Sequence, residues 1–360
     1  MKKIIISGAT SMLGIATIEA ALPDDVEIYA VVRTSPDRSG RIPLSEKIKI
    51  VRGDLQSMKQ IDGLPVDADV FYHFAWAGTN KADRDNPCLQ EKNIAYTLDA
   101  IELAHRIGCK SFVYAGSQAE YGPVNGTIDE NTKHAPMISY GIAKYAAGIL
   151  GKKLCESYGI KHIWGRIFSI YGPHDNEGTM LDYAIKSFDR HESAHFSAAT
   201  HTWNYLYESD AGVMFYKMSQ EDLNSGIYLV ASDKSLQLKQ YIFMLQKAYG
   251  DNAEVEFAKE GEEPPSLRVD NSKTLEELQY IPKVPFEEGI ARMIVARSTR
   301  AHENKANMVN TRQISTFTSE KENTTYSVDF DLSSINARGG EVIPLLLSLL
   351  CSFWRWQHEL

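Results

Sequence analysis

The N-terminal segment carries the pattern that most restricts the fold of this chain. KIIISGATSMLGIATIEAAL combines a β-branched apolar run, a glycine-containing turn and a stretch with helical periodicity, and VEIYAVV supplies a second apolar run. Two buried strands joined by a helix form a βαβ unit. The two lysines and the apolar run imitate a secretory leader, but Gly8 interrupts the run early, so we expect a buried strand instead of an export signal.

The same alternation continues along the chain. Short apolar runs occur at KIKIVRGD, VFYHFAW, SFVYAGS and KHIWGRIFSIYGP, and NIAYTLDAIELAHRIG has helical periodicity. This order predicts an α/β fold with a doubly wound parallel sheet of the Rossmann type. We expect residues 1–297 to form the body, with 1–165 mainly dinucleotide-binding and 166–297 mainly a smaller C-terminal substrate lobe. GIYLVAS is expected to return to the main sheet.

The sequence changes character at about residue 298. A polar Ser/Thr/Asn-rich stretch is followed by the apolar run VIPLLLSLLCSFWRW. That run is shorter than the roughly 20 apolar residues of a membrane-spanning helix, so an anchor is not expected. A helix packed on the body, a partner-binding segment and a tail foreign to the enzyme all stay open, and the sequence assigns no role to residues 298–360.

Charge and cysteine content exclude several classes of function. The net charge of -9 argues against nucleic-acid binding, which needs a basic surface, and favours small-molecule partners. The four cysteines show neither CxxC spacing nor a neighbouring histidine cluster, so we expect no metal site and no disulfide framework. They are Cys88, Cys109, Cys155 and Cys351. A reducing cytoplasm is the expected location.

The turn GATSMLG predicts a dinucleotide site. Glycines between a strand and a helix let a pyrophosphate approach the free N–H groups of the helix N-terminus. Such glycines also occur in purely structural turns, but the βαβ setting favours the binding site. The predicted pyrophosphate-binding residues are Gly8, Ser11, Met12, Leu13 and Gly14, with Ser11 in a position usually held by glycine.

The residues after the next strands indicate which dinucleotide binds. Arg33 follows the second strand, where a NAD site places a carboxylate, and an arginine there can hold a 2′-phosphate. NADP(H) is therefore favoured, while NAD(H) stays open because Asp37 could serve the ribose and Arg33 could be an ordinary surface residue. Further residues are expected at the adenine and along the cleft: Asp54, Leu55, Phe74, Ala75 and Trp76.

The segment SYGIAK places Tyr140 and Lys144 on one face of a predicted helix. A nearby ammonium lowers the pKa of a tyrosine toward the range useful for proton transfer. The spacing alone is common. Ser117 ends a predicted strand upstream, and its hydroxyl could polarise the substrate oxygen that Tyr140 protonates.

Several motifs, in order, resemble one family. They are GATSMLG, GDL, YHFAWAG, Asn93 in EKNIAYTLDA, SQAEYG, YGIAK, RIFSIYGP, WNYLYESDAG and VDNSKTLEELQYIPKVPFEEGI. Over residues 2–297 the chain resembles the extended short-chain dehydrogenase/reductase family, in its NAD-dependent nucleotide-sugar epimerase/dehydratase branch. The resemblance implies that Tyr140 is the general acid/base, that Lys144 binds the nicotinamide ribose and that Ser117 orients the sugar oxygen. It also implies that Asn93 belongs to the cofactor site, and that a homodimer forms through helices near 90–106 and 140–157.

The family's reactions at a sugar ring differ by a few residues. Similar dehydratases carry an Asp-Glu pair after the serine or threonine, whereas this chain has Gln118 and Ala119, with Glu120 one place later. A 4,6-dehydratase is therefore disfavoured. Arg33 favours a reductase, and the local sequence motifs resemble 4-keto-reductases of the CDP-abequose synthase kind. A nucleotide-sugar 4-keto-reductase is therefore favoured. A 4-epimerase with tightly held NAD and a non-catalytic dinucleotide-binding scaffold stay open.

The substrate residues are less well defined. Gln118, Ser169, Trp203 and Arg268 are expected in the substrate site, and Arg166 and Arg268 are candidate phosphate binders. Trp203 stands where UDP-sugar epimerases commonly have arginine, and stacking on a base and core packing are equally open for it. We expect His73 to have a packing or hydrogen-bonding role and Asp210 to be a helix N-cap.

Overall fold

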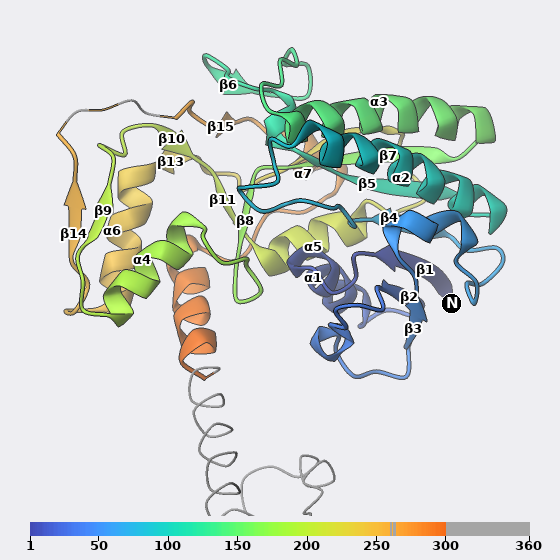
Figure 1. Ribbon diagram of the computed structural model, residues 1–360, viewed down its shortest axis with the longest axis horizontal. Helices are drawn as coiled ribbons and strands as arrows, with labels where there is room; N and C mark the ends of the chain where they lie inside the picture. Colours follow the sequence, from blue (N-terminus) through green and yellow to red (C-terminus); the bar gives the residue numbers. More distant parts are fainter. Residues whose placement is uncertain (260, 262–263, 300–360) are drawn as a thin grey trace, which may run out of the picture. The chain divides into compact units, whose positions relative to one another are not determined.

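A parallel β-sheet forms the centre of the protein, seen here in a computed structural model (Figure 1). The structure describes residues 1–259, 261 and 264–299. Seven of the described strands pair in the order β12-β7-β5-β4-β1-β2-β3, and every neighbouring pair is parallel. Their bounds are Lys2–Ser7 (β1), Val26–Val32 (β2), Ile48–Arg52 (β3), Val70–His73 (β4), Ser111–Ser117 (β5), Lys161–Ile167 (β7) and Gly226–Val230 (β12). The predicted doubly wound Rossmann sheet is confirmed, including the return of GIYLVAS as β12.

Strand β1 shows how the sequence builds the sheet interior. Ile4, Ile5 and Ile6 have no exposed surface, as a strand between two helical layers requires. Because side chains alternate across a strand, Ile4 and Ile6 join the apolar cluster on one face and Ile5 joins the cluster on the other. The expectation of a buried first strand is confirmed.

Helices cover both faces of the sheet (Figure 1). On one face α1 packs against α5, and on the other α2 packs against α3. Their bounds are Met12–Ala21 (α1), Glu208–Lys217 (α5), Pro87–Arg106 (α2) and Ser139–Tyr158 (α3), and the short helix α7 (Ser272–Glu277) contacts β12. Parallel strands need such crossovers, so the carboxyl ends of all seven strands meet at one edge of the sheet.

A smaller lobe, built from segments before and after β12, has its own apolar core. Phe188 of α4, Leu245 of α6 and Ile290 of the helical segment 286–299 are buried together in that core. The lobe contains α4 (Met180–Asp189), β9 (Ala194–Phe196), α6 (Leu238–Tyr249) and β14 (Val255–Phe257). The expected lobe is therefore a small mixed unit whose strands are too short to give a clear sequence pattern.

Three short strand pairs connect this lobe with the sheet edge. β8 (Ser169–Tyr171) pairs with β11 (Tyr205–Tyr207), β10 (Thr202–Trp203) with β13 (Leu236–Gln237), and β6 (Thr127–Ile128) with β15 (Arg268–Val269). The backbone N–H of Leu267 also donates to the carbonyl of Thr202 at 2.8 Å. These contacts bring the segments that hold the predicted substrate residues next to the segment that follows β5.

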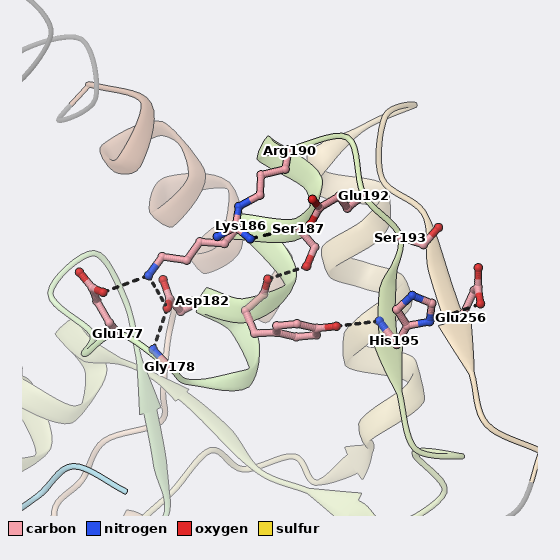
Figure 2. Close-up of a pocket in the computed structure, with 11 residues that line it drawn as sticks. Glu177, Gly178, Asp182, Lys186, Ser187, Arg190, Glu192, Ser193, His195 and Glu256 are labelled. Carbon is pink, nitrogen blue, oxygen red and sulfur yellow. Dashed lines mark hydrogen bonds and ion pairs between the residues drawn. The ribbon is translucent and has the colours of Figure 1, made fainter. Parts of the chain in front are cut away.

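An open pocket of about 870 Å³ lies on the lobe, along α4, β9 and β14 (Figure 2). The ammonium of Lys186 forms ion pairs with Glu177 and Asp182, each at 3.1 Å. The backbone N–H of His195 donates to the hydroxyl of Tyr183 at 3.0 Å. None of the predicted site residues lines this pocket, and its charged groups largely satisfy one another.

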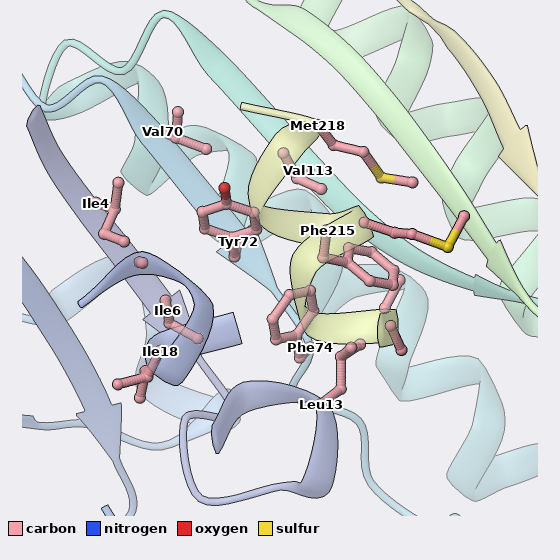
Figure 3. Close-up of a cluster of buried hydrophobic side chains, with 14 of the residues drawn as sticks. Ile4, Ile6, Leu13, Ile18, Val70, Tyr72, Phe74, Val113, Phe215 and Met218 are labelled. Carbon is pink, nitrogen blue, oxygen red and sulfur yellow. The ribbon is translucent and has the colours of Figure 1, made fainter. Parts of the chain in front are cut away.

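The core beneath α1 and α5 is built from strand side chains and helix side chains in contact (Figure 3). Phe74 meets Phe215 of α5 edge to face, with ring centroids 5.1 Å apart. Tyr72 has no exposed ring surface, and its hydroxyl donates to the carbonyl of Tyr216 at 3.3 Å. This packing seats α5 against one face of the sheet.

Residues 300–360, which make up nearly all of the predicted extension, lie outside the described residues, so the extension stays a prediction. Among the described helices, none is long and apolar enough to cross a membrane. The described cysteines, Cys88, Cys109 and Cys155, are free thiols, and Cys351 lies in the undescribed part.

Candidate active site

The turn between β1 and α1 is shaped by two close backbone contacts. Gly8 has φ of +74°, and a Cβ there would lie 2.7 Å from the backbone nitrogen of Ala75. A Cβ on Gly14 would lie 2.4 Å from the carbonyl oxygen of Gly8. Both positions therefore require glycine. The backbone after β4 lies against the start of α1, which fits the cradle in which a pyrophosphate meets a helix N-terminus.

Ser11 takes the position of the missing middle glycine by capping the helix. It is the N-cap of α1, and its hydroxyl accepts the N–H of Gly14 at 3.0 Å. Met12 and Leu13 open the helix, and the Leu13 side chain is buried in the sheet core. Met12 and Leu13 can thus offer backbone N–H groups to a phosphate, and the Ser11 hydroxyl, which accepts from Gly14, still has its own proton to donate.

The end of β2 presents positive charge. Arg33 is exposed directly after the strand. Asp37 is held by Arg52, whose two terminal nitrogens donate to the two carboxylate oxygens at 2.9 and 2.8 Å. The Arg52 guanidinium, together with the N–H and hydroxyl of Ser39, holds the pKa of Asp37 well below its usual range. The carboxylate considered for the ribose is therefore paired, and Arg33 is left at the strand end.

Asp54 and Leu55 follow β3 as predicted. Asp54 is exposed and is the N-cap residue of the short helix η2 (Leu55–Gln60), and Leu55 packs against the apolar cluster under α2. No contact in the structure distinguishes an adenine-binding role for Asp54, so that role stays a prediction.

The segment after β4 is fixed from helix α2. Asn93 is 1% exposed; its Oδ1 accepts the N–H of Ala77 at 2.8 Å, and its Nδ2 donates to the carbonyl of Ala77 at 3.0 Å. Asn93 thus fixes the backbone of the loop after β4, and its place in a cofactor site stays a prediction. Phe74 turns its ring into the core, so only its backbone reaches Gly8, whereas Trp76 is partly exposed.

His73, at the end of β4, has the packing and hydrogen-bonding role expected for it. It is 1% exposed, and its Nδ1 lies 2.8 Å from the hydroxyl of Ser7. Its ring stacks on Phe112 with centroids 5.8 Å apart. Burial lowers the pKa of His73 to about 3, so the ring is neutral at physiological pH.

Lys144 and Tyr140 lie one turn apart near the start of α3. Lys144 is 4% exposed, and its ammonium donates to the carbonyl of Ala115 at 2.7 Å and lies 3.7 Å from the centroid of the Trp76 ring. Burial lowers its pKa to about 7. The same ammonium is 5.9 Å from the centroid of the Tyr140 ring.

Tyr140 has a second cation beside it that the sequence did not reveal. The Arg84 guanidinium lies 5.1 Å from the centroid of the Tyr140 ring, and the Tyr140 N–H donates to the carbonyl of Arg84 at 2.9 Å. Burial raises the pKa of Tyr140, while Arg84 and the hydroxyl of Ser117 lower it. Tyr140, Lys144 and Ser117 are thus brought together, with Arg84 as a fourth member.

The loop that carries Arg84 is fastened to α3. The side chain of Arg84 donates to the carbonyl of Thr79 at 2.9 Å. The next residue, Asp85, accepts both the N–H and the hydroxyl of Ser139 at 3.0 Å. The N-cap residue of α3 makes no side-chain capping bond, so Asp85, from a distant part of the chain, caps the first turn instead. Such a contact has no local sequence signal.

Ser117 closes β5 with its hydroxyl at the sheet edge. It is 9% exposed, and its hydroxyl accepts the N–H of Ala119 at 3.2 Å. Glu120, at the end of η3 (Gln118–Glu120), is fully buried and pairs with Arg166. The expectation that Arg166 binds phosphate is therefore wrong, because the guanidinium has no exposed surface.

The predicted substrate residues lie on the segments that meet this edge. Gln118 follows Ser117, Ser169 lies on β8 and Arg268 is exposed on β15. Trp203 on β10 packs against two apolar clusters, and its indole nitrogen is buried without a hydrogen-bond partner among the described residues. Packing is therefore shown for Trp203, and base stacking stays a prediction, as do the roles of the other three residues.

Asp210 is not the N-cap that the sequence predicted. The cap position of α5 is Tyr207, and Asp210 lies inside the first turn. Its carboxylate accepts the hydroxyl of Tyr280 at 2.6 Å and the N–H groups of Lys283 and Val284, each at 2.9 Å. Asp210 therefore ties the 280–284 segment to α5. A local capping pattern could not distinguish this long-range use of a carboxylate.

Comparison with known proteins agrees with this geometry. The chain is 23% identical over 318 residues to an uncharacterized UDP-glucose epimerase, YtcB, of Bacillus subtilis, covering 82% of this chain and 98% of that protein. It is 22% identical over 301 residues to the CDP-abequose synthase of Salmonella muenchen, covering 81% and 97%. Dehydratases such as the dTDP-glucose 4,6-dehydratase of Streptomyces antibioticus also match, at 23% identity over 263 residues, covering 71% and 78%.

Solved structures share the fold. The UDP-glucuronic acid 4-epimerase of Bacillus cereus, in complex with UDP-glucuronic acid and NAD, superposes with a TM-score of 0.72 at 21% identity, covering 83% of this chain and 99% of that one. The sequence model of the NAD dependent epimerase/dehydratase family matches residues 4–231. The chain belongs to the NAD dependent epimerase/dehydratase family of nucleotide-sugar enzymes.

Proposed function

We propose that this protein acts at C4 of a nucleotide-activated hexose with a bound nicotinamide dinucleotide, most specifically as a 4-keto-sugar reductase. The observation that carries the proposal is the grouping of Ser117, Tyr140 and Lys144 at the carboxyl edge of the sheet, next to the glycine cradle of Gly8 and Gly14. When bound, the dinucleotide exchanges a hydride with the sugar carbon. The protein supplies the proton and the positioning.

Each residue has a distinct part in this chemistry. The hydroxyl of Ser117 donates a hydrogen bond to the sugar oxygen and holds it near Tyr140. Tyr140 gives its phenolic proton to that oxygen during reduction, or removes the proton in the reverse direction. Arg84 favours the tyrosinate that is left behind. Lys144, whose ammonium donates to the carbonyl of Ala115, binds the nicotinamide ribose in this proposal.

The residues at the end of β2 support NADP(H) as the dinucleotide. Arg33 stands exposed where it can form charge-assisted hydrogen bonds with a 2′-phosphate. Asp37, the carboxylate considered for a ribose diol, is already paired with Arg52. A reductase consumes its cofactor in each turnover, so use of NADPH is consistent with net reduction.

Glu120 supports the exclusion of dehydration. Loss of water from the sugar needs an acid and a base beside the serine. The nearest carboxylate, Glu120, points away from solvent and is bonded to Arg166 at 2.6 Å. Gln118 and Ala119 supply no ionisable group.

A 4-epimerase is the second candidate, because several similar structures are epimerases with NAD. These include the Bacillus cereus UDP-glucuronic acid 4-epimerase in complex with NAD. An epimerase returns the hydride within one turnover and keeps its cofactor bound. The Ser117, Tyr140 and Lys144 arrangement serves either reaction.

The dinucleotide that copurifies with the protein separates the two candidates. The protein is purified without added cofactor and denatured, and any released dinucleotide is identified by chromatography and mass. An empty protein that prefers NADPH and oxidises it with CDP- or dTDP-linked 4-keto-deoxyhexoses supports the reductase. Stoichiometric NAD with interconversion of UDP-hexose C4 epimers supports the epimerase. Failure of every nucleotide sugar in both assays overturns the proposal and favours a non-catalytic dinucleotide-binding scaffold.

A further inference from the structure

Behind Ser117 lies an ion pair that is completely shielded from solvent. Glu120 and Arg166 each have no exposed surface, and the Arg166 Nε donates to Glu120 Oε2 at 2.6 Å. Glu120 comes from η3, directly after β5, and Arg166 comes from the neighbouring strand β7. The pair therefore joins two adjacent strands at the edge where the catalytic serine lies.

The second carboxylate oxygen of Glu120 acts on Ser117 itself. Glu120 Oε1 accepts the backbone N–H of Ser117 at 2.7 Å, and the indole N–H of Trp164 lies 3.4 Å from the same oxygen. The Ser117 hydroxyl in turn accepts the N–H of Ala119. Together these bonds form a reciprocal capping box. The box fixes the serine backbone from one side and its side-chain oxygen from the other.

Arg166 is itself held from several sides. Its guanidinium lies 4.4 Å from the Trp164 ring centroid and 4.8 Å from the Tyr121 ring centroid. Its Nη1 contacts Nε2 of His134, whose ring stacks on Tyr121 at 5.1 Å and on Tyr145 at 4.6 Å. Burial, with Arg166 adding to it, lowers the pKa of His134 to about 4, so a neutral ring accepts from the arginine.

The ion pair and Trp164 also leave no room for a side chain at Gly116, the residue before Ser117. A Cβ on Gly116 would lie 2.2 Å from Nε1 of Trp164 and 2.7 Å from Oε1 of Glu120. A buried ion pair gives little net stability compared with apolar side chains of equal size. Its value here is geometric, since a charged carboxylate holds the Ser117 N–H more firmly than a neutral acceptor does.

We propose that Glu120 and Arg166 are positioning residues that fix the Ser117 hydroxyl for proton transfer with the sugar oxygen. This inference rests on the proposed function, because it needs Ser117 to touch the substrate. Glu120 and Arg166 act only through Ser117 and do not contact the substrate themselves.

A double-mutant cycle on the full-length protein tests this. Ser117→Ala, Glu120→Gln and the double variant are compared by kcat, KM and thermal unfolding. We expect Glu120→Gln to lower kcat by at least about tenfold with KM little changed, and to lower kcat by less than about twofold when Ser117 is already alanine. Equal factors in both backgrounds would show that the pair supports only the fold, and would overturn the inference.

Two further variants keep the test decisive. If Glu120→Gln does not fold, Arg166→Lys, which retains the positive charge, takes its place. It should lower kcat in the wild-type background and lower it by less than about twofold when Ser117 is already alanine. Asp210→Asn is the matched control, because Asp210 is a buried carboxylate outside the site; it should lower the unfolding temperature and leave kcat unchanged. If Ser117→Ala alone turns over normally, the serine role in the proposed function is wrong and this inference falls with it.

Discussion

The Lys144 ammonium lies 3.7 Å from the centroid of the Trp76 ring and is almost fully buried. The ring face attracts the charge, and the carbonyl of Ala115 accepts one of its protons at 2.7 Å. These two contacts do not replace the water that the ammonium loses, so its pKa falls from 10.5 to about 7. Burying the charged form of Lys144 therefore lowers the free energy of unfolding.

Replacing Lys144 should make the protein more stable at neutral and acidic pH. Between pH 7 and 10.5 the unfolded chain keeps the Lys144 proton and the folded chain loses it, so wild-type stability rises with pH over that window. Lys144→Met removes the cost, which corresponds to roughly 5 kcal/mol. Urea unfolding of the protein without cofactor should show the variant as the more stable form at pH 6, with the difference shrinking toward pH 10. A difference that does not change with pH would contradict the account.

Arg84→Met should move the titration of Tyr140 to higher pH. Arg84 lowers the pKa of Tyr140, so the tyrosinate is harder to form without it. The limb of the kcat/KM against pH profile that reports Tyr140 should shift upward in either reaction direction. Arg84→Lys keeps the charge and should shift it less. An unmoved limb in Arg84→Met would show that the arginine does not act on the phenol.

The sequence could predict the alternation of strands and helices, because that depends on local periodicity. It could also predict the set of Ser117, Tyr140 and Lys144, because that depends on a motif. The pairing of Glu120 with Arg166 could not be predicted, because the two residues are 46 positions apart and only the register of β5 with β7 brings them together. From the sequence, Glu120 could only be compared with the Asp-Glu pair of similar dehydratases, from which it lies one place too late. Arg84 was missed for a similar reason, since its loop meets α3 only in the folded chain.

Arg33→Ala should weaken the use of NADPH selectively. A guanidinium and a phosphate form charge-assisted hydrogen bonds, and losing them should raise KM for NADPH by about 10-fold or more. KM for NADH should stay nearly constant. Arg38→Ala, which removes another exposed arginine of the same loop, is the control. Equal effects on both cofactors would show that Arg33 does not bind a 2′-phosphate.

The exposed apolar face of α3 supports the proposed homodimer. Ile142, Ile149 and Leu150 are 50%, 42% and 47% exposed and lie on one side of the helix. Ile149→Lys with Leu150→Lys should convert a dimer to a monomer, because charge would be buried at the contact. Light scattering after size-exclusion chromatography measures this, with Ile281→Lys as an exposed control elsewhere. A wild-type monomer would rule out the dimer.

Tyr140→Phe tests the central claim most directly, because it removes one oxygen and keeps the ring that contacts Trp76 and Arg84. Turnover of the nucleotide sugar should fall by about 100-fold to 10,000-fold. Binding of the dinucleotide, followed by calorimetry, should be retained. Turnover close to that of the wild type would contradict the assignment of Tyr140 as the proton-transfer residue.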